Sequence, residues 1–335
     1  MLRLTKNVLK QPLTALIFPG QGTQAAGKML PDSVKALPNF KEVMESSNRI
    51  MGYDIHALME GDEMDKKIYE RGSYKIYNLN DTEVSQPAIF ISTALALQAA
   101  LKDEINKIDL NNCVFAGYSL GEYAALYASG KVDFPDALTM TLFRGLAMQK
   151  DCKRRKTKLF TLMTRGKSHT SIKAAIQASK QNEDEILEVS AHLAPNIYTV
   201  GGDDRAITEL VSKKREFGIL AAKPVPVSGA FHTKAMGDAA LSFQLTLKKM
   251  KNSFNDNQRV CYSNVTGDVY ADIKEIRHLL PKQIRAQVKW HQIVTNLAKR
   301  DDIGRVIEIG PGDGQLGKLL KMTDGKLHQK YSYIF

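Results

Sequence analysis

The stretch Val114-Phe115-Ala116-Gly117-Tyr118-Ser119-Leu120-Gly121-Glu122 predicts a strand, a sharp turn and a helix in direct succession. Its first residues are apolar enough for a buried strand, and the run 122–126 favours a helix. Glycine stands two residues before and two residues after Ser119, where so tight a turn leaves little room for side chains. We therefore predict an α/β fold with a parallel sheet and with Ser119 at the apex of the turn.

Ser119 is the candidate nucleophile of this turn. Its hydroxyl would lie above the N-terminus of the following helix, where backbone N–H groups can stabilise a developing oxyanion. The alternative is a glycine-rich turn in which Ser119 is only a helix cap. The strand before the motif and the helix after it favour the catalytic interpretation.

A serine nucleophile needs a base, and His232 is the best placed of the seven histidines. It lies in Val227-Ser228-Gly229-Ala230-Phe231-His232-Thr233, between a strand rich in proline and valine and a predicted helix. His192 and His291 are the competing candidates, and the pattern alone leaves all three open.

Composition limits the class of protein. The chain has 335 residues, of which 43% are hydrophobic and 25% charged, as is usual for globular domains. Its three cysteines fit neither a disulfide framework nor a zinc site, so we expect a reducing compartment and no metal. No uninterrupted apolar run reaches the roughly 18 residues that cross a membrane, so we expect no membrane contact.

The net charge of +11 suggests a negatively charged partner or substrate. No nucleic-acid-binding signature accompanies it, so we expect no nucleic-acid partner. An acidic protein, a phosphorylated substrate or the compartment itself would explain the charge. Residues 1–11 carry Arg3, Lys6 and Lys10 without an acidic residue, which is typical of a transit-peptide remnant or of a solvated basic tail.

Element order predicts two domains. Residues 12–153 and 225–335 form the predicted large α/β-hydrolase-like domain, which contains the nucleophile elbow at Ser119. Residues 154–224 form an inserted small domain whose β-α-β-β-α-β order is ferredoxin-like. The expected strands are 13–18, 158–163, 187–190, 197–200, 220–225, 259–263 and 305–309, besides the one before Ser119. The expected helices are 39–51, 86–102, 134–150, 168–180, 204–217, 233–250 and 290–298, besides the one after Gly121.

Six ordered motifs resemble those of the malonyl-CoA:acyl carrier protein transacylases, most closely the mitochondrial type. They are Phe18-Pro19-Gly20-Gln21-Gly22, the Gly117–Glu122 elbow, Phe143-Arg144-Gly145-Leu146-Ala147-Met148, Gly229-Ala230-Phe231-His232, Tyr262-Ser263-Asn264-Val265 and Glu308-Ile309-Gly310-Pro311-Gly312. The resemblance extends from about Leu13 to Leu320. It implies a two-step transfer of a malonyl group from malonyl-CoA to the phosphopantetheine thiol of acyl carrier protein.

The resemblance also implies a role for each site residue. Ser119 would be the nucleophile and His232 its base, while the backbone N–H groups of Gln21 and Leu120 would form the oxyanion hole. Arg144 would bind the malonyl carboxylate, for which a planar guanidinium is well suited. The remaining implied roles are these: Gln86 and Phe231 bind substrate, Gln283 orients the histidine through its backbone carbonyl, and Asn264 supports the nearby turn.

Three departures from the family's pattern are visible. Tyr118 stands where most members have histidine, and Ile197 stands where bacterial members have glutamine. The segment 310–316 holds one residue more than usual. None of these positions carries the nucleophile, the base or the carboxylate-binding arginine.

The expected setting follows from the same resemblance. We expect a monomer in the mitochondrial matrix, or alternatively the cytoplasm, that needs no cofactor and docks an acidic acyl carrier protein on basic patches at 153–156 and 213–215. A serine hydrolase or thioesterase built on the same elbow is the competing enzyme class. A non-catalytic interaction protein with this fold is the other alternative.

Overall fold

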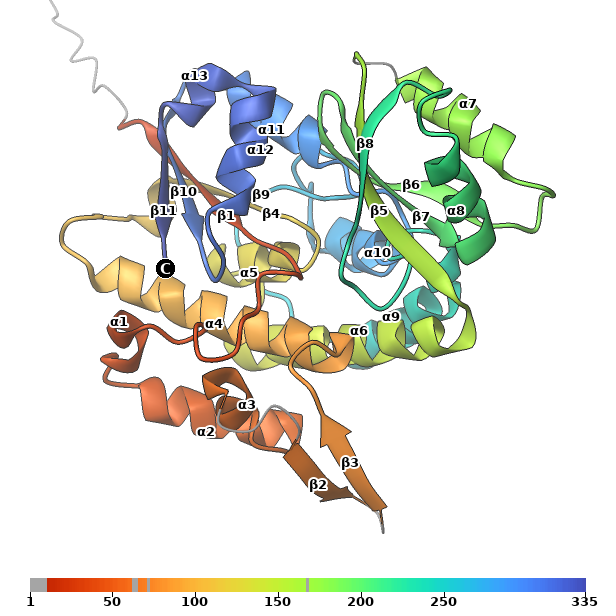
Figure 1. Ribbon diagram of the computed structural model, residues 1–335. Helices are drawn as coiled ribbons and strands as arrows, with labels where there is room; N and C mark the ends of the chain where they lie inside the picture. The colour runs from red at the N-terminus through yellow and green to blue at the C-terminus, as the bar shows by residue number, and fades with distance from the viewer. Residues whose placement is uncertain (1–10, 62–65, 71–72, 167–168) are drawn as a thin grey trace, which may run out of the picture.

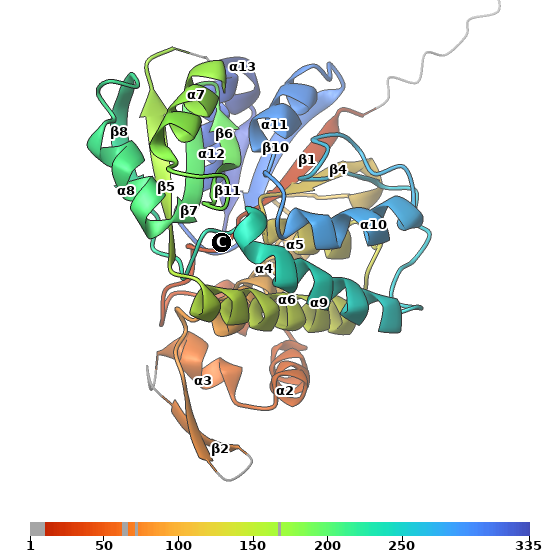
Figure 2. The ribbon, with the colours of Figure 1, turned by 90° about the vertical axis from the view of Figure 1, so that its right-hand side faces the viewer.

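The computed structural model describes residues 11–61, 66–70, 73–166 and 169–335, and it describes side chains outside 62–76 and 167–171. Nearly all of the predicted basic tail, residues 1–11, therefore lies outside the described residues. Figures 1 and 2 show a large unit around one sheet and a smaller unit beside it, with the β2–β3 hairpin projecting below.

A five-stranded parallel sheet forms the centre of the large unit, which confirms the predicted α/β class. The strand order is β11-β10-β1-β4-β9. Their bounds are β1 Leu13–Phe18, β4 Cys113–Gly117, β9 Val260–Cys261, β10 Ile303–Ile309 and β11 Tyr331–Ile334. The predicted strand 259–263 is wrong at both ends, because only two of its residues join the ladder.

Alternating side chains of β1 and β4 supply the cores on both faces of this sheet. Leu16, Phe18 and Phe115 pack with α4 (Thr82–Lys102), α5 (Gly121–Ala128) and α6 (Phe134–Arg154) on one face. Ala15, Ile17, Val114 and Ala116 pack with α11 (Trp290–Ala298) and α12 (Gln315–Thr323) on the other. Burial on both faces explains why these strands are continuous apolar runs.

Helix α4 is buried on nearly all of its sides. By length and composition it could cross a membrane, although no uninterrupted apolar run predicted this. However, 83% of its apolar window is buried inside the protein, as in the central helix of a globular domain. It also begins at Thr82, about one turn before the predicted start, so that Gln86 and Pro87 lie within it.

The small unit has the predicted order of elements: β5 (Thr157–Thr164), α7 (His169–Ser179), β6 (Leu187–Ala194), β7 (Ile197–Asp203), α8 (Asp204–Ser212) and β8 (Ile219–Pro224). Its four strands pair antiparallel in the order β6-β7-β5-β8. The unit has an apolar core of its own, which includes Leu162, Tyr198 and Ile207. Helix α8 ends five residues before the predicted end, and turns follow up to Gly218, whose φ is 67°.

Several short elements were not predicted. They are α1 (Asp32–Lys35), α3 (Ile55–Glu60), β2 (Lys66–Glu70), β3 (Ser73–Tyr77), the 3₁₀ turn Leu110–Asn112, α10 (Ile273–Gln283), α12, α13 (Gly325–His328) and β11. Helix α2 spans Phe40–Met51, close to its prediction. The predicted helix 233–250 is a 3₁₀ turn, Lys234–Met236, followed by α9, Gly237–Lys249.

Candidate active site

The turn at Ser119 depends on close backbone packing. Ser119 has φ 53°, a left-handed conformation that is unusual for a non-glycine residue. A Cβ atom on Gly117 would overlap the backbone of Gly121, and a Cβ atom on Gly121 would overlap the carbonyl of Phe18. The two glycines are therefore required by sterics, as the sequence predicted.

Asn264 fastens this turn from a neighbouring segment. Its Oδ1 accepts from the backbone N–H of Ser119 at 2.6 Å, and its Nδ2 donates to the carbonyl of Gly117 at 2.7 Å. Both groups belong to a buried turn, where unpaired backbone groups are costly. The structure thus places Asn264 where a supporting role was predicted.

His232 is the histidine that the fold brings to Ser119. Its Nε2 lies 2.7 Å from Ser119 Oγ, and its Nδ1 lies 2.7 Å from the carbonyl oxygen of Gln283. Because a carbonyl can only accept, Nδ1 carries the proton and Nε2 accepts from the serine hydroxyl. His192 and His291 instead lie against each other, with ring centroids 4.5 Å apart.

The surroundings of His232 keep it neutral. Burial lowers its pKa from 6.5 to about 3, and the positive charge of Arg144 contributes to the same shift. A neutral imidazole with a free lone pair facing a hydroxyl is what a general base requires. His232 also has a left-handed backbone, with φ 59°.

The backbone N–H groups of Gln21 and Leu120 are the candidate oxyanion hole. Leu120 is the N-cap residue of α5, and Gln21 lies in the turn after β1. Neither N–H is engaged by a backbone or side-chain hydrogen bond in the described part of the chain. The Gln21 side chain is held by Gln86, whose Nε2 donates to its Oε1 at 3.2 Å.

Arg144 is a buried cation directly behind the serine. Its Nη2 donates to Ser119 Oγ at 3.2 Å and to Gln283 Oε1 at 3.0 Å, and its Nη1 donates to Gln86 Oε1 at 2.7 Å. All of these acceptors are neutral, and the side chain is 1% exposed. Burial lowers the pKa of Arg144 from its ordinary value. A buried guanidinium hydrogen-bonded to neutral oxygens is electrostatically suited to receive an anion.

Sequence reasoning missed Glu122 and Tyr270. The fully buried Glu122 carboxylate accepts from the Tyr270 hydroxyl, from the backbone N–H of Asn264 at 3.0 Å and from Gln283 Nε2 at 2.9 Å. Burial raises the pKa of Glu122 to about 7. The motif contained Glu122, but only the packing shows that its carboxylate turns inward.

A cavity of about 620 Å³ opens above Ser119 between the two units. Gln21, Tyr118, Phe231 and His232 line it, together with residues of β5, β7, the segment after β8 and α12. Gln86 and Arg144, both predicted to bind substrate, do not line this cavity; both are buried behind Ser119, in contact with each other. Ile197 does not line the cavity either, and packs in the apolar cluster that α11 and α12 form with the large sheet.

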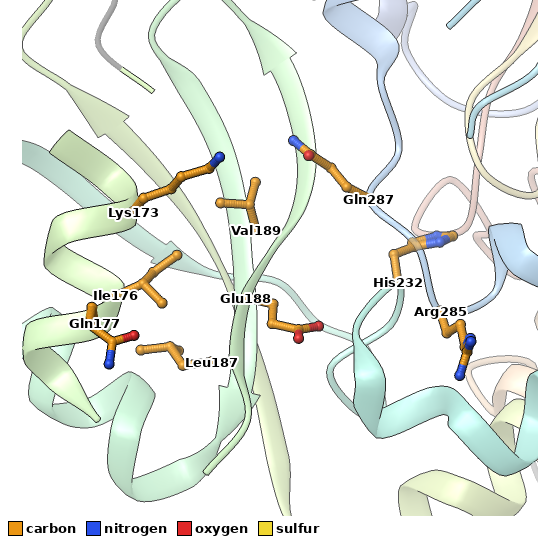
Figure 3. Close-up of a pocket in the computed structure, with 9 residues that line it drawn as sticks. All are labelled: Lys173, Ile176, Gln177, Leu187, Glu188, Val189, His232, Arg285 and Gln287. Atoms are coloured by element: carbon orange, nitrogen blue, oxygen red, sulfur yellow. The ribbon is translucent and has the colours of Figure 1, made fainter. Parts of the chain in front are cut away.

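A second cavity, of about 390 Å³, reaches His232 from another side. Figure 3 shows Lys173 and Glu188 of the small unit across from Arg285 and Gln287, which follow α10. Ser119 is not among its lining residues, whereas it lines the larger cavity.

The predicted docking patches are partly neutralised by local ion pairs. Arg154 pairs with Asp238, and Arg155 pairs with Asp203. Lys213 pairs with Glu209 at 2.7 Å. These contacts reduce the positive charge that the two patches present to a partner.

Known proteins resemble this chain along nearly its whole length. The family model of the acyl transferase domain matches residues 15–311. A probable mitochondrial malonyl-CoA-acyl carrier protein transacylase of Drosophila melanogaster is 31% identical, covering 96% of this chain and 82% of that protein. The mitochondrial malonyl-CoA-acyl carrier protein transacylase of Mus musculus is 29% identical, covering 96% of this chain and 81% of that protein.

Solved structures agree with these relatives. The crystal structure of MCAT from Streptococcus pneumoniae has a TM-score of 0.80 at 26% identity and covers 96% of this chain and 95% of its own. The second is the structure of PlMCAT:AntF, a type II PKS acyl-carrier protein in complex with its malonyl-transacylase. The matched chain has a TM-score of 0.80 at 25% identity, and the match covers 96% of this chain and 94% of that one. With the ordered motifs and the geometry around Ser119, these matches show that the chain belongs to the acyl transferase family, on the pattern of the malonyl-CoA-acyl carrier protein transacylases.

Proposed function

We propose that this protein transfers a malonyl group from malonyl-CoA to the phosphopantetheine thiol of acyl carrier protein, the step that supplies extender units for fatty acid synthesis. The observation that carries the proposal is the buried Arg144 guanidinium 3.2 Å from the hydroxyl of Ser119. A site that forms simple acyl esters has no need of a cation at that depth. A site for a dicarboxylic acyl group does, because the second carboxylate must be neutralised.

The first half of the reaction loads the enzyme. Ser119 Oγ attacks the thioester carbonyl of malonyl-CoA while His232 Nε2 takes the hydroxyl proton. The N–H groups of Gln21 and Leu120 stabilise the resulting oxyanion. The C–S bond then breaks, CoA leaves as the thiol with the proton from His232, and a malonyl-serine ester remains.

The second half returns the enzyme to its starting state. The carrier's thiol loses its proton to His232 and attacks the ester carbonyl. Collapse of the tetrahedral intermediate breaks the bond to Ser119 Oγ, which regains its proton from His232. No atom changes its oxidation state and no metal-bound group takes part in these steps, so we propose that the reaction needs no cofactor.

Arg144 selects the acyl group in this mechanism. The malonyl carboxylate takes the place of the hydrogen bond between Arg144 Nη2 and Ser119 Oγ, and forms a bidentate pair instead. Gln86 and Gln283 hold the guanidinium plane through their Oε1 atoms. Phe231 borders the space above the serine. An acetyl group leaves the cation without an anionic partner, which is the basis for discrimination.

The larger cavity fits the pantetheine arm that both substrates share. Its walls include Leu159, Leu193, Val225 and Leu319, which suit the methylene and methyl groups of an extended arm. Lys223 of β8 and Lys318 of α12 are exposed at its lining, and neither is ion-paired in the described part of the chain. We propose that they receive the phosphate at the end of the arm.

The remaining assignments complete the proposal. The protein acts as a monomer in the mitochondrial matrix and contacts neither membrane nor nucleic acid, and its net charge of +11 favours an acidic carrier. The sheet and elbow of 12–153 and 225–335 support an α/β-hydrolase-like domain. The strand order β6-β7-β5-β8 supports a ferredoxin-like insertion at 154–224.

Mass spectrometry of the intact protein tests this function. After separate exposure to malonyl-, acetyl- and methylmalonyl-CoA, we expect a malonyl adduct that disappears when phosphopantetheinylated carrier protein is added, with malonyl-carrier formed in equal amount. Release of free malonate at the same rate without carrier would instead identify a hydrolase. The absence of any adduct would exclude the serine-ester route.

A further inference from the structure

Glu122 lies outside the machinery of the proposed reaction, although it is fully buried within the same hydrogen-bond network. It touches neither Ser119 Oγ nor His232 through a hydrogen bond of its side chain. One of its hydrogen-bond partners, Gln283, is however also a partner of Arg144. We propose that Glu122 is a positioning residue that fixes the orientation of the Gln283 amide, and that this orientation keeps Arg144 aimed at the acyl group on Ser119.

The amide of Gln283 can be satisfied in only one orientation. Its Nε2 donates to the carbonyl of Ser119 at 2.6 Å and to Glu122 Oε2 at 2.9 Å. Its Oε1 accepts from Arg144 Nη2 at 3.0 Å. A flipped amide would place a donor against the guanidinium, which has only donors, and an acceptor against two acceptors. Glu122 Oε2 and the Ser119 carbonyl, as the two acceptors of Nε2, therefore set which end of the amide faces Arg144.

Glu122 is itself held by two other elements. Its Oε1 accepts from the Tyr270 hydroxyl and from the backbone N–H of Asn264, the residue that also fastens the elbow. The carboxylate therefore cannot rotate without breaking buried hydrogen bonds. The chain of contacts runs from Tyr270 through Glu122 and Gln283 to Arg144.

Gln283 makes contacts in the site through both its side chain and its main chain. Its side chain holds Arg144, and its backbone carbonyl orients His232 at 2.7 Å. Because the carbonyl belongs to the main chain at the end of α10, it does not depend on the amide orientation. Loss of Glu122 should therefore affect Arg144 more than His232.

A merely structural role for Glu122 makes a different prediction. An acidic residue in the first turn of a helix stabilises the helix dipole, and its loss would lower the loading of every acyl group alike. A positioning role acts through Arg144 and so concerns acyl groups that carry a second carboxylate. The ratio of malonyl to acetyl loading separates the two.

The experiment measures this ratio in Glu122→Gln, with malonyl-CoA and acetyl-CoA as probes and the Ser119 adduct as readout. Gln at this position keeps the size of the side chain but can turn a donor toward Gln283. We expect kcat/KM for malonyl loading to fall by about tenfold or more, as for loss of a charged hydrogen bond, and acetyl loading to change by less than about threefold. Equal loss for both substrates, or an unchanged ratio, would overturn the proposal.

Two further variants keep the test decisive. Tyr270→Phe removes one donor to Glu122, and we expect a smaller shift of the ratio in the same direction. If Glu122→Gln does not fold, an unchanged ratio in Tyr270→Phe overturns the proposal. Glu275→Gln is the matched control, because Glu275 lies in the first turn of α10 and bonds only locally to Ala271 N–H at 2.6 Å. We expect no change of the ratio there.

The inference rests on the proposed malonyl transfer, and the two can fail separately. If the natural protein forms no malonyl adduct, the proposed function fails. If it forms the adduct and Glu122→Gln keeps the natural ratio, only the role of Glu122 fails.

Discussion

Arg144 Nη2 lies 3.2 Å from Ser119 Oγ, so the candidate nucleophile and a buried cation share a direct hydrogen bond. Such a contact places a positive charge where a substrate's second carboxylate would arrive. Burial is the main cause of the lowered pKa of His232, and the nearby charge of Arg144 adds to it. The candidate nucleophile, its neighbouring histidine and the buried arginine therefore form one electrostatic unit.

Arg144→Ala should separate acyl selection from catalysis. Truncating one partner of a buried charge pair costs about 2–5 kcal/mol, so kcat/KM for malonyl loading should fall at least about thirtyfold. Acetyl loading should persist, because Ser119, His232 and the oxyanion hole remain. Adduct formation from the two thioesters checks this. Unchanged malonyl kinetics would remove Arg144 from substrate binding.

Ser119→Ala should abolish the adduct with every acyl-CoA, because no other nucleophile replaces its Oγ. The variant should remain folded, since the Cβ and the backbone hydrogen bond to Asn264 are kept. Intact mass and circular dichroism check the two statements. A surviving mass shift would place the nucleophile elsewhere.

Gly121→Ala should destabilise the protein severely, by about 3 kcal/mol or more, because its Cβ would overlap the backbone carbonyl of Phe18 in β1. Gly237→Ala is the control, since a Cβ there meets no atom within 4 Å at the start of α9. Chemical denaturation compares them. Equal midpoints would contradict the steric account of the elbow.

The free energy of unfolding should depend on pH through His232. The pKa of this residue is about 3 in the folded protein against an ordinary 6.5, so between these values the unfolded chain binds a proton that the folded one does not. Stability from this residue is therefore lost as pH falls through that interval. His232→Gln should show a shallower decline in urea titrations. An identical decline in both proteins would refute the lowered pKa.

Lys223→Ala combined with Lys318→Ala should raise KM for malonyl-CoA with little change in kcat. The lysines line the cavity that contains Ser119, and their loss removes about 1 kcal/mol of attraction for phosphate per exposed contact. Malonyl-pantetheine, which lacks the phosphate, is the control substrate and should be handled alike by both proteins. An equal rise of KM for the control substrate would instead point to a change in cavity shape.

The fold was predictable where local pattern and packing agree. The apolar run before Ser119 became β4, and Leu13–Phe18 became β1, because strands buried on both faces need continuous apolar sequence. The end of α8 and the start of α9 were missed because capping and 3₁₀ turns depend on geometry within single turns.

The site residues were also predictable only in part from the sequence. Ser119, His232 and Arg144 stand in ordered motifs, and the structure brings them together. Glu122 and Tyr270 could not be predicted, because they are 148 residues apart and meet only when the turn after β9 packs on α5. Gln86 was expected to bind substrate, and in the structure it is buried in α4, where it accepts a hydrogen bond from Arg144.

The left-handed backbones of Ser119 and His232 lower the stability of the folded protein at two positions that its activity requires. Each such conformation costs a non-glycine residue of order 1–3 kcal/mol, and here it falls on the two residues that handle the proton. Glycine at either position would relieve that cost and end the chemistry. A search for heat-resistant variants of this protein would therefore tend to select inactive ones at these two positions.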